Sequence, residues 1–139
     1  MNTARAAQAA APSLFLAFDF GTRRVGVASG NSLTHSATPL TTLAQDGNEA
    51  RFAVIGKLIA EWQPAALVVG VPRHPDGAPH DNTRRARRFA HQLHGRFGLP
   101  VHEVDERYTT TEVLAARASD VDAASAALIL EQFFNEHPR

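Results

Sequence analysis

The most constraining feature of this sequence is an unbroken apolar run at residues 65–71 (AALVVGV). A strand without polar alternation is buried on both faces, which is typical of parallel sheets covered by helices on both sides. Upstream, apolar residues recur at helical spacing over 51–62, and Pro64 ends that pattern. Downstream, we expect a second helix from residue 81 or 82 to 97 and then a strand over 101–104. The chain therefore predicts an α/β fold.

The beginning of the chain predicts an antiparallel meander. Apolar runs at 14–18 and 25–28 flank a short polar segment whose Gly21 suits a tight turn. A third extended stretch, 38–43, contains Pro39, which cannot donate a hydrogen bond to a neighbouring strand and so indicates a sheet edge.

Together these elements predict the architecture of the chain. Right-handed crossovers would place the fourth and fifth strands beside the first. We expect a mixed five-stranded sheet flanked by helices, in which strands 1–3 form an antiparallel meander and strands 4 and 5 run parallel to strand 1. A short helix over 109–117 and a final helix over 121–135 complete the expected order.

Composition excludes several classes of protein but does not by itself indicate a function. A length of 139 residues suits one domain, expected over 14–139 after a disordered N-terminal tail over 1–13. The 14 basic residues balance the 14 acidic ones, so net charge indicates no class of partner. The absence of cysteine excludes disulfides and thiolate zinc sites, and no apolar run approaches the roughly 18 residues of a membrane span. We therefore expect no membrane partner.

Acidic residues stand where the predicted strands end. In parallel α/β sheets the reactive crevice lies at the carboxyl ends of the strands. Asp19 ends the first strand, and Asp105 and Glu106 follow the fifth. On the last helix, Asp122 falls in the apolar sector that must face the sheet, whereas Ser125 lies outside it. We expect Asp19, Glu106 and Asp122 to converge at one edge, with Asp105 beside them.

Converging carboxylates favour a divalent metal site. Such groups repel one another unless a cation lies between them, and Mg²⁺ or Mn²⁺ takes oxygen ligands of this kind. The pattern predicts catalytic and metal-binding roles for Asp19, Glu106 and Asp122, with Asp105 as a further ligand, in phosphodiester hydrolysis. Each acid also has a structural interpretation: Asp19 as a turn cap, Asp122 as a partner of the helix dipole, and Glu106 as a surface partner of Arg107.

Arginines supply candidate contacts to phosphate. All but one of the 14 basic residues are arginine, which suits bidentate phosphate contacts. Candidates near the acidic edge or on one face of the helix over 82–97 are Arg23, Arg24, Arg73, Arg84, Arg87, Arg88 and Arg107. A solvated helix face explains the helical arginines equally well. We interpret His91 and His94, an i, i+3 pair on that exposed face, as surface residues rather than a zinc site.

In combination, these segments resemble the YqgF/RuvX family of the ribonuclease H-like superfamily. The matching segments, in order, are 16–22 (LAFDFGT), 25–27 (VGV), 68–72 (VVGVP), 76–77 (DG), 86–90 (ARRFA), 105–110 (DERYTT) and 121–127 (VDAASAA). The first segment alone is also similar to actin-like ATPases and sugar kinases, but we do not expect their second lobe in 139 residues.

The resemblance implies a cytoplasmic, metal-dependent nuclease that matures the 5′ end of precursor 16S ribosomal RNA, with the family's acids falling on Asp19, Glu106 and Asp122. Two alternatives remain. A Holliday junction resolvase would act on branched DNA as a homodimer rather than a monomer. A nucleic-acid-binding or ribosome-assembly module would have acids that hold no metal. The chain departs from the family in a short segment, 118–121, before Asp122 and in a more basic loop at 73–75.

Overall fold

The computed structural model describes residues 13–45, 47–72, 81–105 and 120–137. Its helices and strands are, in chain order, β1 (Leu14–Phe20), β2 (Val25–Asn31), β3 (Ser36–Leu43), α2 (Asn48–Trp62), β4 (Ala66–Val71), α3 (Asp81–Phe97), β5 (Val101–Asp105) and α5 (Val121–Glu136). The expected helix over 109–117 lies outside the described residues, as do residues 1–12 of the expected tail.

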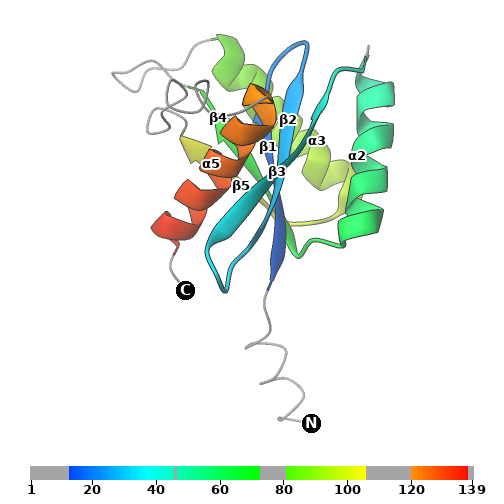
Figure 1. Cartoon of the computed structure of the whole chain (residues 1–139). Coiled ribbons are helices and arrows are strands. Elements are labelled where there is room, and N and C mark those ends of the chain that lie inside the picture. Colours follow the sequence, from blue (N-terminus) through cyan, green and yellow to red (C-terminus); the bar gives the residue numbers. More distant parts are fainter. Residues whose placement is uncertain (1–12, 46, 73–80, 106–119, 138–139) are drawn as a thin grey trace.

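The strands form the predicted mixed sheet, in the order β3-β2-β1-β4-β5 (Figure 1). β2 pairs antiparallel with both β1 and β3, whereas β4 pairs parallel with both β1 and β5. The carboxyl ends of β1, β4 and β5 therefore meet at one edge of the sheet. The α/β fold and its strand directions are confirmed.

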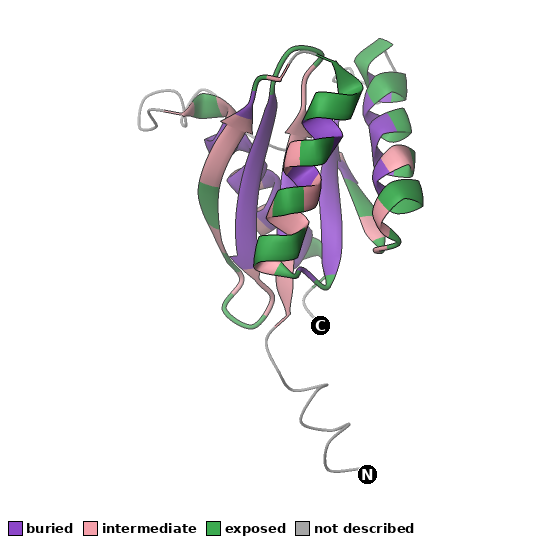
Figure 2. Ribbon diagram, turned by 90° about the vertical axis from the view of Figure 1, so that its right-hand side faces the viewer, coloured by how far each residue is buried: buried purple, intermediate pink, exposed green. Residues whose placement is uncertain are grey.

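Helices cover both faces of the sheet. α2 and α3 pack on one face, where Leu16 and Phe18 of β1 are buried among their apolar side chains. α5 packs on the other face, where Ala17 of β1 lies in a cluster with Ile129. Figure 2 shows buried central strands between helices whose outward sides are exposed. Because side chains alternate along a strand, Asp19 shares the α5 face with Ala17.

The boundaries of several elements differ slightly from the predicted ones. α2 begins at Asn48, after Gly47 with φ 92°, and ends at Trp62, where the C-cap residue Gln63 adopts a left-handed conformation before Pro64. Pro39 lies in β3 at the register shift opposite Ala28, and β3 is the edge strand that Pro39 predicted. No helix in the described ranges is long and apolar enough to span a membrane.

Candidate active site

Asp19 lies in a row of residues that crosses four strands. It is directly opposite Gly26 of β2 and Gly70 of β4, and Gly26 in turn is opposite Thr42 of β3. Residues opposed in this way share one face of the sheet, with Cα atoms about 4.5–5.5 Å apart in antiparallel pairs. Asp19 is half-buried and has a glycine on each side. The register partners of Asp19 on both neighbouring strands therefore have no side chain.

The start of α5 rests directly on this row. A Cβ atom added to Gly26 would lie 1.9 Å from the carbonyl oxygen of Asp122 and 2.8 Å from the backbone nitrogen of Ala123. Only glycine therefore permits the first turn of α5 to approach β2 so closely. Since Gly26 is the register partner of Asp19, the contact places Asp122 one strand away from Asp19. The structure therefore places the start of α5 over the strand that pairs with the end of β1.

Asp120 fixes the same helix end from its other side. It is the N-cap of α5, and its Oδ1 accepts a hydrogen bond from the backbone nitrogen of Ala123 at 3.1 Å. The hydroxyl of Thr42 donates a second hydrogen bond to the same oxygen. Thr42 belongs to the row described above, so β2 and β3 together hold the first turn of α5 in place.

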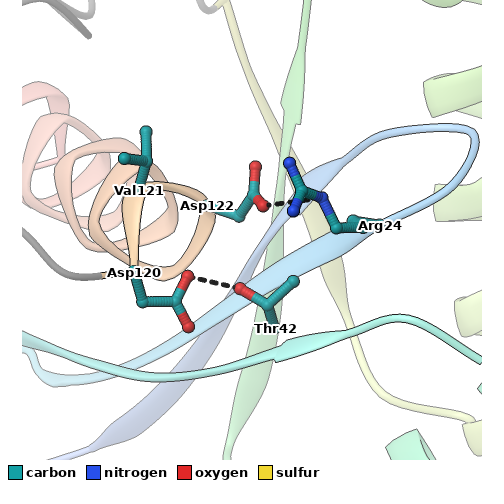
Figure 3. A pocket seen from close by; sticks show the side chains of 5 residues that line it. All are labelled: Arg24, Thr42, Asp120, Val121 and Asp122. Atoms are coloured by element: carbon teal, nitrogen blue, oxygen red, sulfur yellow. Dashed lines mark hydrogen bonds and ion pairs between the residues drawn. The ribbon is translucent and has the colours of Figure 1, made fainter. Parts of the chain in front are cut away.

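Arg24 completes the site. Its Nε lies 3.2 Å from Oδ2 of Asp122, and the two side chains are 66% and 31% exposed, respectively. A pocket opens here, lined by Arg24, Thr42, Asp120, Val121 and Asp122. Figure 3 shows the Arg24 guanidinium and the Asp122 carboxylate pointing toward each other across it. The pocket lies between the turn after β1 and the start of α5.

The other predicted acids are distributed differently. Asp105 ends β5 and pairs with Val71. Two residues earlier, Glu103 forms an ion pair with Arg87 of α3. By strand alternation Asp105 therefore lies on the α3 face, whereas Asp19 lies on the α5 face. Glu106 lies outside the described residues.

The residues present fit a divalent cation of the Mg²⁺ or Mn²⁺ type. Within the described ranges, no group of three histidine, aspartate or glutamate side chains forms a complete metal site. Asp19 and Asp122 nevertheless bring hard oxygen donors to adjoining positions, and a pair of carboxylates is a usual protein contribution to magnesium binding. The pocket beside Asp122 provides space for further ligands such as water or a phosphate oxygen.

The predicted phosphate-binding arginines fall into two groups. Arg23 and Arg24 are exposed at the turn after β1, at the site. Arg84, Arg87 and Arg88 are exposed on α3, which covers the opposite face of the sheet. Arg84 pairs with Asp81 at 3.3 Å, and Arg87 pairs with Glu103 at 3.2 Å. Arg73 and Arg107 lie outside the described residues.

Sequence reasoning missed two residues that position the site, Gly26 and Thr42, and it did not predict that Asp120 caps α5. The glycine following Val25 was a usable signal, because glycine inside a strand often marks a close approach of another backbone. The prediction for Ser125 was wrong, since this residue is only 5% exposed. α5 is therefore buried over a wider sector than helical spacing alone predicted.

Comparison with known proteins identifies the family. The sequence model of RuvX, described as "Holliday junction resolvase", matches residues 13–136. The chain belongs to the RuvX family. The RuvX match includes every described element from β1 to α5, so Asp19 and Asp122 both lie within it.

RuvX relatives with high identity carry the name "Putative pre-16S rRNA nuclease". One from Polaromonas sp. (strain JS666) is 63% identical over 124 residues, covering 89% of this chain and 89% of the relative. One from Albidiferax ferrireducens is 63% identical over 119 residues, covering 86% of this chain and 76% of the relative. One from Burkholderia vietnamiensis is 52% identical, covering 88% and 89%.

Solved structures support the fold at low sequence identity. Thermus thermophilus RuvC in complex with a Holliday junction substrate has a TM-score of 0.61 and 14% identity, covering 91% of this chain and 96% of that chain. The fowlpox virus Holliday junction resolvase has a TM-score of 0.53 and 9% identity, covering 91% and 99%. The RuvX-family chain therefore has a RuvC-like, ribonuclease H-like α/β fold.

Proposed function

We propose that this protein is a divalent-metal-dependent nuclease that processes the 5′ end of precursor 16S ribosomal RNA in the cytoplasm. The observation that carries the proposal is the seating of Asp122 over Gly26, the register partner of Asp19. Two carboxylates are thereby held at one strand end, beside an arginine that can bind phosphate. The names of the most similar relatives support precursor ribosomal RNA as the substrate.

The chemistry follows from the donor set. Asp19 and Asp122, with Glu106 as the proposed further ligand, would hold Mg²⁺ or Mn²⁺. When bound, the ion would orient and activate water and stabilise the leaving oxygen of a phosphodiester. The carboxylates would hold the ion, and the pocket beside Asp122 would admit the scissile phosphate. Arg24 and the neighbouring Arg23 neutralise charge on the phosphate oxygens.

The test compares two substrates under two metal conditions. Purified protein is incubated with precursor 16S ribosomal RNA and with a four-way DNA junction, each with Mn²⁺ and with EDTA. We expect cleavage of the RNA with Mn²⁺, and none with EDTA. Asp19→Asn should abolish cleavage while the protein stays folded, whereas Glu61→Gln, an exposed change on α2, should cleave at the wild-type rate. Wild-type cleavage by Asp19→Asn would refute the role of this residue.

A junction resolvase is the second candidate, favoured by the description of the matching family model and by the similarity in fold to RuvC. A resolvase must cut two strands symmetrically and therefore needs two sites in a homodimer. Symmetric cutting of the DNA junction by a dimer, without cleavage of the RNA, would replace the ribosomal proposal. A monomer that cleaves RNA would exclude this candidate.

A binding module without catalysis is the remaining alternative. Its acids would hold no metal, although its arginines could still bind RNA. Calorimetric titration with Mn²⁺ separates the two functions. RNA affinity without any Mn²⁺ binding would favour the module over the nuclease.

A further inference from the structure

The ion pair between Arg24 and Asp122 joins a predicted phosphate ligand to a predicted metal ligand. Their closest atoms are 3.2 Å apart, at the pocket that Figure 3 shows. In this arrangement the guanidinium occupies one oxygen of a carboxylate that a metal ion would also use. The Arg24 guanidinium therefore cannot keep its ion pair with Asp122 and form a bidentate contact with a phosphate at the same time.

The exposure of the pair indicates that it is easily broken. The Arg24 side chain is 66% exposed, and ion pairs in such surroundings contribute little to stability because water screens them. The first turn of α5 has other anchors, namely the contact with Gly26 and the hydrogen bond from Thr42 to Asp120. Arg24 is not needed to keep Asp122 in place, so its pairing calls for an electrostatic explanation.

Electrostatics supplies that explanation. Asp122 lies in the first turn of α5, directly over the register partner of Asp19, and carboxylates gathered at one edge of a sheet repel one another. The Arg24 guanidinium offsets the negative charge of Asp122 while no divalent cation is bound. Once a divalent cation joins the carboxylates, the guanidinium faces a like charge instead and is repelled. A phosphate that arrives at the same site then offers it a bidentate anionic partner.

We propose that Arg24 exchanges partners during the reaction cycle: it neutralises Asp122 in the metal-free protein and moves to the substrate phosphate when metal binds. This inference rests on the proposed nuclease function. It makes Arg24 a residue that opposes metal binding in the absence of RNA and favours RNA binding in its presence. The coupling would make the site bind metal more tightly when a phosphate is present to receive the guanidinium.

The test uses electron paramagnetic resonance to measure Mn²⁺ binding to the full chain without RNA. It compares the wild type with Arg24→Gln. Removal of the competing cation should tighten Mn²⁺ binding by about three- to tenfold, with the thermal unfolding midpoint unchanged. Arg24→Lys keeps the charge and should bind Mn²⁺ as the wild type does. Arg23→Gln removes the adjacent positive charge and should change the affinity by less than about twofold.

A second measurement addresses the other half of the exchange. RNA affinity in the presence of Ca²⁺, chosen as a non-cleaving ion, should fall for Arg24→Gln and be restored in part by Arg24→Lys. Unchanged or weaker Mn²⁺ binding by Arg24→Gln would overturn the exchange, because a merely structural pair would loosen Asp122 when broken. If the wild type nevertheless binds Mn²⁺ and cleaves RNA, the nuclease proposal holds and only the exchange of Arg24 is refuted. If the wild type binds no Mn²⁺, both fail.

Discussion

Gly26 and Asp122 are in backbone contact, so closely that a Cβ atom on Gly26 would lie 1.9 Å from the Asp122 carbonyl oxygen. Through this contact β2 sets the distance between α5 and Asp19, which is opposite Gly26 in the sheet. The carboxylate geometry of the proposed site therefore depends on a residue that has no side chain.

Gly26→Ala should destabilise the protein and reduce its activity. The added methyl group would overlap backbone atoms that cannot move without shifting α5, and overpacking of this kind costs about 1–3 kcal/mol. A displacement of about 1 Å at the site should lower the cleavage rate about 100-fold. Gly95→Ala in α3 is a matched control, because its Cβ would meet no atom within 4 Å. Equal effects of the two substitutions on cleavage would contradict this account.

Asp120→Ala should remove the N-cap of α5. Loss of an N-cap costs about 1 kcal/mol, and here the Thr42 hydroxyl loses its acceptor as well. Asp120→Asn keeps an acceptor oxygen and should retain most of the stability. Urea denaturation of both variants measures the difference in the free energy of unfolding. Identical curves for alanine and asparagine at this position would show that the cap is not used.

If the arginines of α3 contact phosphates of the RNA backbone, each of them should contribute to the salt dependence of RNA affinity. Arg84→Gln and Arg88→Gln should each reduce the slope of log affinity against log salt by about 0.7–0.9. Arg96→Gln is the control on the same helix, since the Arg96 guanidinium pairs with Glu49 and lies 4.3 Å from the Phe52 ring centroid. Unchanged slopes for Arg84→Gln and Arg88→Gln would assign these residues to a merely solvated face.

His102 should make the stability of the fold sensitive to acid. Burial, and secondarily repulsion from His137, lowers the pKa of His102 below its ordinary value of 6.5. The unfolded chain therefore binds this proton more readily than the folded protein. Stability from neutral His102 is fully present above about pH 6.5 and is lost as the pH falls through the lower folded-state pKa.

Urea denaturation between pH 8 and pH 5 measures this effect. His102→Phe keeps a ring against Phe133, whose centroid is 4.9 Å from that of His102. The substitution should reduce the loss of stability on acidification. A variant whose midpoint falls as steeply as that of the wild type would place the sensitivity at other groups.

The sequence predicted the fold well because its strongest signals, apolar runs and helical spacing, depend only on neighbouring residues. The apolar run of β4 and the helical spacing of α2 and α3 each report burial locally, and Pro39 identified the edge strand correctly. The prediction that Asp19 and Asp122 lie at the same edge of the sheet uses signals of the same kind. It follows from the direction of β1 and from the angle of one residue on a helix.

Other features of the site have no periodic signal. The hydrogen bond between Thr42 and Asp120 joins residues 78 apart in sequence and depends on which strand lies under the start of α5. Ser125 is buried although helical spacing places it outside the apolar sector of α5. The face of Asp105, by contrast, was accessible to reasoning, since the apolar Val104 before it packs toward α5 and alternation places Asp105 on the other side.

The central claim is that Asp19 and Asp122 hold one divalent ion together. The most direct measurement is calorimetric Mn²⁺ binding to the wild type, Asp19→Asn and Asp122→Asn, with Glu61→Gln as the control for loss of an exposed charge. We predict that each aspartate variant stays folded and binds Mn²⁺ at least about tenfold more weakly, while the control matches the wild type. Wild-type affinity in either aspartate variant would contradict the account.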